Sequence, residues 1–240
     1  MIDLTTSIDL NKQFDMVPRG KAPMSICILA TIFKEIIHEK HFQYGLMIDG
    51  QPVIHPKGGH LYCINKVSSP EEFEKHFVGC CLEMASYLKY FLDKVLKDYG
   101  DYKVTPWIMI WSDEMETAHA FVTVESDYLY LFNMSFGKMG GIYNAKSYAD
   151  ALTFMAMGMS VFDQDRSKFL LNEYQFKPIP YDAVNKDLFK LSCRDYVRYC
   201  GEHYKPVDLQ FDGLKMRVKF MNCDNYSKKE KQAKSNDDQK

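Results

Sequence analysis

The 240-residue sequence lacks the features of secreted and membrane proteins. No stretch approaches the run of about 18 apolar residues that a membrane-spanning helix needs. Residues 1–15 are polar and acidic, whereas a signal peptide is basic and then apolar, so we expect no export. The seven cysteines are an odd number without the dense spacing of a disulfide scaffold, which favours reduced thiols. We therefore expect a cytoplasmic protein with no membrane partner.

The sequence also lacks an excess of charge of either sign. Thirty Lys and Arg residues stand against 32 Asp and Glu residues, a formal net charge of -2. Nucleic-acid-binding proteins present a basic field to the phosphates, so we expect no nucleic-acid partner. Residues 226–240 are the basic exception, with five lysines, three acidic residues and no apolar stretch to bury. We predict that this segment is a disordered tail.

Apolar material, in contrast, is plentiful, at 46% hydrophobic and 14% aromatic residues. A chain of this length buries roughly 70 to 75% of its unfolded surface, so it needs no metal or disulfide merely to stay folded. We find no internal repeat and no linker rich in Pro, Gly or Ser. Residues 1–225 are therefore predicted to form one α+β domain, with an N-terminal helix and hairpin and C-terminal helical and hairpin elaborations.

Periodicity and turn residues predict the order of the elements. Asp49-Gly50 indicates a hairpin, because both residues accept positive φ. Ser69, Pro70 and Glu72 predict a helix start with a capping box. The full prediction is a helix in 22–40, strands 44–48 and 52–54, a short helix from 69 interrupted at Gly79, a long helix from 81 to about 100, strands 104–111, 118–125 and 128–133, a helical stretch after 144, a helix 187–200 capped by Gly201, and a hairpin at 212–213.

Three residues suited to thiol chemistry follow one another on the long helix and the next strands. Cys81 begins the helix, where unsatisfied N–H groups and the helix dipole favour the thiolate. If the turn centres on Ser126, His119 and Asn133 lie directly opposite each other, with Cβ atoms roughly 4.5 to 5.5 Å apart. Asn133 would then accept the Nδ1 proton of His119 and leave Nε2 to face the thiol. This arrangement is typical of nucleophilic catalysis by cysteine.

The same segments resemble a known family. Residues 79–85, GCCLEMA, look like the GxCxxxA motif of the transglutaminase-like branch of the papain-like cysteine hydrolases. Residues 118–122 and Asn133 resemble that family's second and third motifs, and the resemblance covers about residues 69–143. It implies Cys81 as nucleophile, His119 as general base and acid, and Asn133 as the residue that orients His119. It also implies a central helix with Cys81 at its N-terminus, packed on an antiparallel sheet.

Two positions depart from the family pattern. The third position is usually acidic in this branch, and Asn133 is neutral, so it fixes the tautomer of His119 but stabilises the imidazolium less. Cys80 places a second sulfur beside Cys81. The helical stripe favours Cys81 as the nucleophile, because Ala85, one turn later, belongs to the core-facing stripe.

The expected function is that of a cysteine-dependent hydrolase or acyltransferase. It would act on an amide bond of a protein or peptide substrate through a thioester acyl-enzyme, with the Cys81 backbone N–H as an oxyanion donor and no cofactor. Protease, deamidase and transglutaminase share this nucleophile and base, so the sequence does not separate them. The alternative is a catalytically silent module of the same fold that binds a protein partner.

A structural zinc site and ordinary core packing are the competing interpretations of these residue types. Zinc ligands are available among His55, His60, Cys63, His76 and Cys80, although no second tight pair completes a tetrahedral set. Free cysteines are usually buried, so we expect core positions for Cys27, Cys63, Cys193, Cys200 and Cys223. We expect core or groove walls for Trp107, Trp111, Tyr128, Tyr130 and Phe132, and solvated side chains for Glu83 and Asp127.

Overall fold

The structure is a computed structural model that describes residues 42–56, 60–97, 102–110, 118–126, 128–135, 140–162, 176–207 and 219–220. The helix predicted in 22–40, the hairpin at 212–213, the tail 226–240 and residues Cys27, Trp111, Asp127 and Cys223 lie outside these ranges. In chain order the elements are β1 (Gln43–Ile48), β2 (Gln51–Ile54), α3 (His60–Ile64), α4 (Pro70–Phe73), β3 (Val78–Gly79), α5 (Cys81–Leu96), β4 (Lys103–Ile110), β5 (Ala118–Glu125), β6 (Leu129–Asn133), β7 (Gly141–Ala145), α6 (Tyr148–Phe162), β8 (Lys177–Pro180), the 3-10 helix η2 (Leu188–Lys190), α8 (Cys193–His203) and β9 (Lys219–Phe220).

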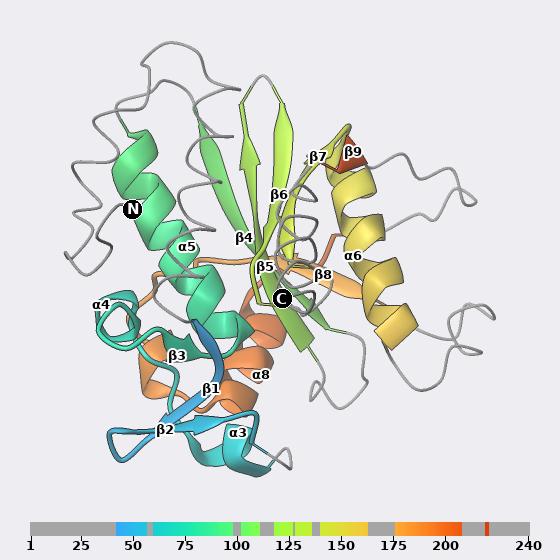
Figure 1. Cartoon of the computed structure of the whole chain (residues 1–240). Helices are drawn as coiled ribbons and strands as arrows, with labels where there is room; N and C mark the ends of the chain where they lie inside the picture. Colours follow the sequence, from blue (N-terminus) through green and yellow to red (C-terminus); the bar gives the residue numbers. More distant parts are fainter. Residues whose placement is uncertain are drawn as a thin grey trace, which may run out of the picture.

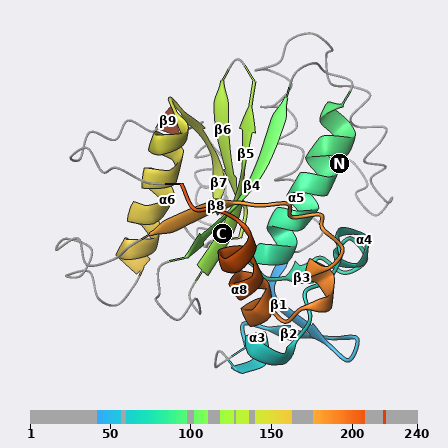
Figure 2. The same cartoon turned by 180° about the vertical axis from the view of Figure 1, so that it is seen from behind.

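The described chain has a mixed α+β fold built on two sheets. The larger is antiparallel throughout, with strand order β8-β4-β5-β6-β7-β9. In the smaller, of order β2-β1-β3, β1 pairs antiparallel with β2 and parallel with β3. The smaller sheet and α8 lie at the end of the molecule where α5 begins (Figures 1 and 2). The start of α5 is thus surrounded by elements from both halves of the chain.

Helices α5 and α6 cover opposite faces of the larger sheet (Figure 1). Successive residues of a strand point to opposite faces, so β5 divides its side chains between two cores. Ala120, Val122 and Val124 belong to the core on the α5 side, and Phe121 belongs to the core on the α6 side. Among the α5 residues of the first core, one set repeats at helical spacing: Leu82, Ala85, Leu88, Leu92 and Leu96. The amphipathic stripe of α5 therefore fixes which side of the sheet its N-terminus approaches.

The predicted turn at Asp49-Gly50 and the N-cap at Ser69 are confirmed. Asp49 and Gly50 have φ of 50° and 75°, and they join β1 to β2 as predicted. Ser69 caps α4, its side chain accepting a hydrogen bond from the Glu72 N–H at 3.3 Å. Helix α4 ends at Phe73, well before Gly79, which instead closes β3.

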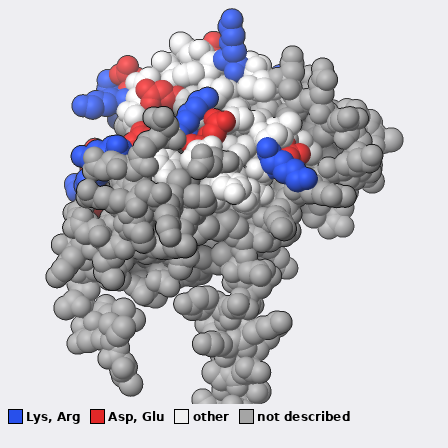
Figure 3. All heavy atoms as spheres, turned by 90° about the horizontal axis from the view of Figure 1, so that it is seen from above, with Lys and Arg blue, Asp and Glu red and all other residues white. Residues whose placement is uncertain are grey.

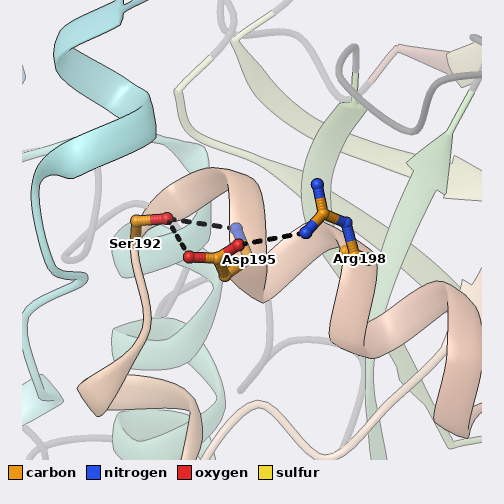
Figure 4. A network of polar contacts seen from close by, with 3 residues as sticks. All are labelled: Ser192, Asp195 and Arg198. Atoms are coloured by element: carbon orange, nitrogen blue, oxygen red, sulfur yellow. Dashed lines mark hydrogen bonds and ion pairs between the residues drawn. The ribbon is translucent and has the colours of Figure 1, made fainter.

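The helix predicted over 187–200 is wrong in its start and its end. The segment forms the 3-10 helix η2 and then restarts as α8, which runs past Gly201 to His203. The restart has a local cause: the Ser192 hydroxyl accepts from the Asp195 N–H at 3.2 Å and donates to the Asp195 carboxylate at 2.8 Å (Figure 4). Because Ser192 is an effective N-cap, the first residue of the new helix is Cys193.

Several elements were not predicted, namely α3, β3, β7, β8 and β9. Strand β8 contains Pro178 and Pro180, which cannot donate to a ladder. The two prolines are tolerated because β8 is the edge strand beside β4.

Within the described ranges, no helix is both long and apolar enough to cross a membrane. On the face seen in Figure 3, acidic and basic side chains are interspersed.

Candidate active site

The turn into α5 is organised by Glu83. Its Oε2 accepts the Cys80 N–H at 2.6 Å and its Oε1 accepts the Ser68 N–H at 3.0 Å. Gly79 makes room for this carboxylate, because a Cβ there would lie 2.7 Å from Oε2. Cys80, in an extended conformation, is the N-cap, and Cys81 is the first residue of the helix. Position 79 therefore requires glycine, because the Glu83 carboxylate lies too close to the backbone to leave room for a Cβ atom.

The expectation that Glu83 is solvated is wrong, because only 1% of its surface is exposed. Burial raises its pKa above the ordinary 4.5, while the hydrogen bonds from Ser68 and Cys80 oppose that shift. The spacing contains the missed signal: a polar residue at the N-cap and Glu three positions later form a capping box, here with Cys80 in place of Ser or Thr.

His119 and Asn133 meet through a hydrogen bond of 2.9 Å between Nε2 and Oδ1. Both side chains are buried. An amide oxygen only accepts, so Nε2 carries the proton and Nδ1 is the nitrogen that can meet the thiol. The expected orientation, with Nδ1 on Asn133 and Nε2 toward the sulfur, is therefore wrong.

The register predicted for this hairpin is also wrong, by two positions. The strands pair Glu125 with Leu129 and Val122 with Phe132, so continuation of the ladder sets Asn133 opposite Phe121 rather than His119. A hydrogen bond of 2.9 Å from the Ser126 N–H to the Tyr128 carbonyl oxygen closes the turn. A shift of two residues keeps every side chain on its face, so the two residues still meet diagonally.

Residues His119, Asn133 and Cys81 all stand near the ends of their elements. His119 is the second residue of β5, Asn133 the last of β6 and Cys81 the first of α5. By strand alternation His119 shares a face with Phe121, and their rings lie 6.3 Å apart. Phe121 faces the α6 side. His119 and Cys81 thus stand where β5 and α5 begin, and their interaction lowers the pKa of the Cys81 thiol.

The Cys81 thiol is 7% exposed and is held between two side chains. A hydrogen bond with the Cys80 side chain and burial raise the pKa of Cys81 well above its ordinary value, and the hydrogen bond with His119 lowers it. The net direction is opposite to the expectation that the helix N-terminus favours the thiolate. Cys80 and burial favour the protonated thiol, whereas His119 favours the thiolate.

A third sulfur lies behind this pair. The Sγ atoms of Cys80 and Cys193 are 3.8 Å apart, which joins the start of α5 to the start of α8. The contact with Cys193 raises the pKa of Cys80, as burial does, and the hydrogen bond with Cys81 lowers it. Cys193 belongs to the core cluster as predicted. Its place beside Cys80 was not predicted, since 113 positions separate the two in sequence.

A cavity of about 440 Å³ opens on these sulfurs. Its lining residues come from distant parts of the chain and are Tyr44, Tyr62, Cys63, Cys80, Cys81, Leu82, Ala118, Cys193, Arg194 and Val197. Burial raises the pKa of Tyr44 well above its ordinary value, and nearby Cys81 raises it further, so the phenol stays protonated. The two tyrosines and Arg194 were not predicted, because nothing in their own segments sets them apart.

The proposed zinc ligands are not brought together. Across the described ranges, no group of three or more His, Cys, Asp or Glu side chains is placed to hold a metal ion. His55 stacks on Tyr44 with ring centroids 6.5 Å apart, and His76 accepts the Val78 N–H at 3.0 Å. The side chain of His60 is outside the described part of the structure.

The candidate catalytic residues therefore lie together: His119 hydrogen bonds Asn133 and is close enough to Cys81 to lower the pKa of its thiol, and Cys81 lines a cavity. No protein-family model, no curated protein and no solved structure matches this chain. The chemistry of the site follows from its own residues.

Proposed function

We propose that the chain is a cysteine-dependent hydrolase or acyltransferase that acts on amide bonds of a protein or peptide, with the papain-like fold of the transglutaminase-like branch. One observation carries the proposal: Cys81 stands at the N-terminus of α5 and lines the cavity, and its thiol interacts with His119, which hydrogen bonds Asn133 at 2.9 Å. Nucleophile, base and orienting residue are the three parts that cysteine catalysis needs.

The first step is attack of the Cys81 sulfur on the carbonyl carbon of the substrate. Because the pKa of Cys81 is raised, the proton leaves during the attack and passes to His119 Nδ1. The Nε2–H of His119 stays on Asn133 Oδ1, which keeps the imidazole in the required tautomer. His119 is thus the general base of this step.

The carbonyl oxygen becomes an oxyanion as the sulfur–carbon bond forms. The Cys81 N–H, at the first position of α5, is one donor, and the protonated Tyr44 hydroxyl on the cavity wall is the second. Collapse breaks the carbon–nitrogen bond, and the imidazolium gives its proton to the leaving amine. Water or an amine then attacks the thioester, with His119 again as base, and Cys81 is restored as a thiol.

A catalytically silent binding module is the second candidate, and a specific observation favours it. Cys81 is only 7% exposed, and contact with Cys80 and burial both raise its pKa. A thiol in such a state is slow to react unless a base assists it. The two candidates differ in one testable property, the formation of an acyl-enzyme.

p-Nitrophenyl acetate, a small acyl donor, distinguishes these candidates. The enzyme would release a burst of p-nitrophenol and then turn over, and Cys81→Ala would abolish both. Cys200→Ala is the matched control, since Cys200 is also buried but does not line the cavity. Absence of a burst in the folded wild-type protein would favour the binding module.

The fate of the acyl group separates hydrolase from acyltransferase. Adding a primary amine such as glycine methyl ester to the same reaction offers an alternative acceptor to water. Accumulation of the acetylated amine at the expense of acetate indicates an acyltransferase. Unchanged acetate release indicates a hydrolase.

A further inference from the structure

We infer that Cys80 and Cys193 form a reversible disulfide when the protein meets a peroxide, which makes the floor of the cavity a site of covalent modification. The inference stands on the placement of the two sulfurs and does not depend on the proposed hydrolase activity. It assigns a role to two cysteines that the proposed mechanism leaves unused.

The geometry already places the two sulfurs in contact. Their Sγ atoms are 3.8 Å apart, and a disulfide bond would bring them about 1.8 Å closer. Each residue stands at the beginning of a helix, Cys80 as the N-cap of α5 and Cys193 as the first residue of α8. Because the sulfurs are already in contact, we expect rotation of the two side chains to close the bond.

The start of α8 is held firmly in place for this pairing. The Ser192 side chain caps the helix through Asp195, and Arg198 bonds the same carboxylate at 3.5 Å (Figure 4). The backbone before it is tied by a hydrogen bond of 3.0 Å from the Val67 N–H to the Leu191 carbonyl oxygen. Cys193 is therefore presented to Cys80 by a fixed backbone.

Cys193 is a better partner for Cys80 than the adjacent Cys81. Neighbouring Cα atoms across a trans peptide lie about 3.8 Å apart, below the roughly 4.4 to 6.8 Å that disulfides span. No cis peptide occurs in the described ranges. The disulfide with Cys193 leaves the Cys81 sulfur as a thiol, available for its own chemistry.

A small oxidant can reach this pair although the residues are buried. Cys80 and Cys193 are 2% and 6% exposed, yet both line the cavity of about 440 Å³. The Cys80 thiolate attacks one peroxide oxygen, the O–O bond breaks and the released hydroxide takes up a proton, which gives a sulfenic acid and water. The Cys193 sulfur then attacks the sulfenic sulfur, the S–O bond breaks, and the released hydroxide takes up the Cys193 proton and leaves as a second water. Two thiols are oxidised and one peroxide is reduced to two waters.

The test is peptide mapping of the full chain after treatment with hydrogen peroxide at pH 8. Remaining thiols are blocked with N-ethylmaleimide before digestion. We expect one intramolecular cross-link between the Cys80 and Cys193 peptides, an N-ethylmaleimide adduct on Cys81, and full reversal by dithiothreitol. A link between Cys80 and Cys81, or peroxide products confined to sulfinic and sulfonic acids, would overturn the inference.

Two variants separate the inference from the proposed function. Cys81→Ala should still form the link between Cys80 and Cys193, because the pair does not need the nucleophile. Cys193→Ala should abolish it, whereas Cys200→Ala, which changes a buried cysteine of the same helix, should not. Circular dichroism confirms that each variant is folded. A disulfide from Cys80 to another cysteine that forms equally well in the wild-type protein and in Cys193→Ala, or loss of the Cys80–Cys193 link in Cys81→Ala, contradicts the assignment.

Discussion

Asn133 Oδ1 accepts a hydrogen bond of 2.9 Å from His119 Nε2, although the ladder of β5 and β6 places the two residues diagonally rather than opposite each other. The diagonal distance suits the pair, because an imidazole and an amide together can span what two short side chains cannot. The hydrogen bond restricts the rotation of both side chains and fixes the tautomer of His119.

We propose that Asn133 acts by positioning His119, so its variants should change how activity depends on pH. Asn133→Asp should retain turnover of p-nitrophenyl acetate, but a carboxylate beside the imidazole stabilises the imidazolium. The rising limb of the pH–rate profile should therefore move to higher pH, because only neutral His119 acts as base. A profile that does not move would argue against this role.

Removing the side chain of His119 or of Asn133 should lower the acylation rate. His119→Ala should lower the acylation rate by about 10²- to 10⁴-fold, the usual contribution of a general base. Asn133→Ala should lower it by less, since the base remains. Thermal unfolding of both variants shows whether the effect is chemical or structural.

Alkylation of Cys81 should depend on pH in a way that reports its neighbours. Because the pKa of Cys81 lies above the ordinary 9.0, its labelling by iodoacetamide should be slow at neutral pH and rise only at alkaline pH. Cys80→Ala removes the first cause of that shift, so the midpoint should move to lower pH. His119→Ala removes a stabiliser of the thiolate, so the midpoint should move to higher pH. Mass spectrometry of the Cys81 peptide measures both, with Cys200→Ala as the unchanged control.

Glu83→Gln should destabilise the fold at neutral pH. The carboxylate accepts from two backbone N–H groups, and an amide has only one oxygen, so one buried N–H loses its partner at a cost of about 1 to 3 kcal/mol. Urea denaturation measures this loss. Glu72→Gln, an exposed glutamate near the start of α4, should change stability by less than about 0.5 kcal/mol.

Protonation of Glu83 should make the free energy of unfolding depend on pH. Its pKa in the folded protein is raised above 4.5, so the folded state holds the proton more tightly than the unfolded state. The contribution is therefore fully present below pH 4.5 and is lost as the pH rises through the pKa of the folded state. Glu83→Gln should lack this slope. An identical pH dependence in the two proteins would contradict the buried, proton-binding role of Glu83.

Tyr44 is expected to be a donor to the oxyanion. Tyr44→Phe should lower kcat for p-nitrophenyl acetate by about 10²- to 10³-fold with little change in KM, because the hydrogen bond matters most in the transition state. Tyr62→Phe, which changes another tyrosine of the cavity wall, should have a smaller effect. Equal effects of the two variants would mean that Tyr44 only shapes the cavity.

The parts of the fold that could be predicted are those determined by neighbouring residues. Asp49-Gly50 makes a turn and Ser69 caps a helix, because each acts on backbone groups within a few positions. Cys81 at the start of α5 follows from the same kind of local signal. Strand β8 could not be predicted, since its two prolines are acceptable only at a sheet edge, and that edge is set by the whole sheet.

In the candidate site, too, some features follow from neighbouring residues and others depend on packing between distant parts of the chain. That His119 and Asn133 share a face follows from the period of a strand, but their register depends on the length of one turn. The pKa of Cys81 depends on burial and on Cys80, and the contact of Cys80 with Cys193 depends on how two distant helices pack. No local pattern records such packing.

The central claim is that Cys81 carries the acyl group during turnover. It is tested most directly by quenching the reaction with p-nitrophenyl acetate in acid and mapping the acetyl group by mass spectrometry. The account predicts a thioester on Cys81 that decays in the wild-type protein, and no such adduct in Cys81→Ala. Acetyl groups found only on lysines or on other cysteines, with Cys81 unmodified, would contradict it.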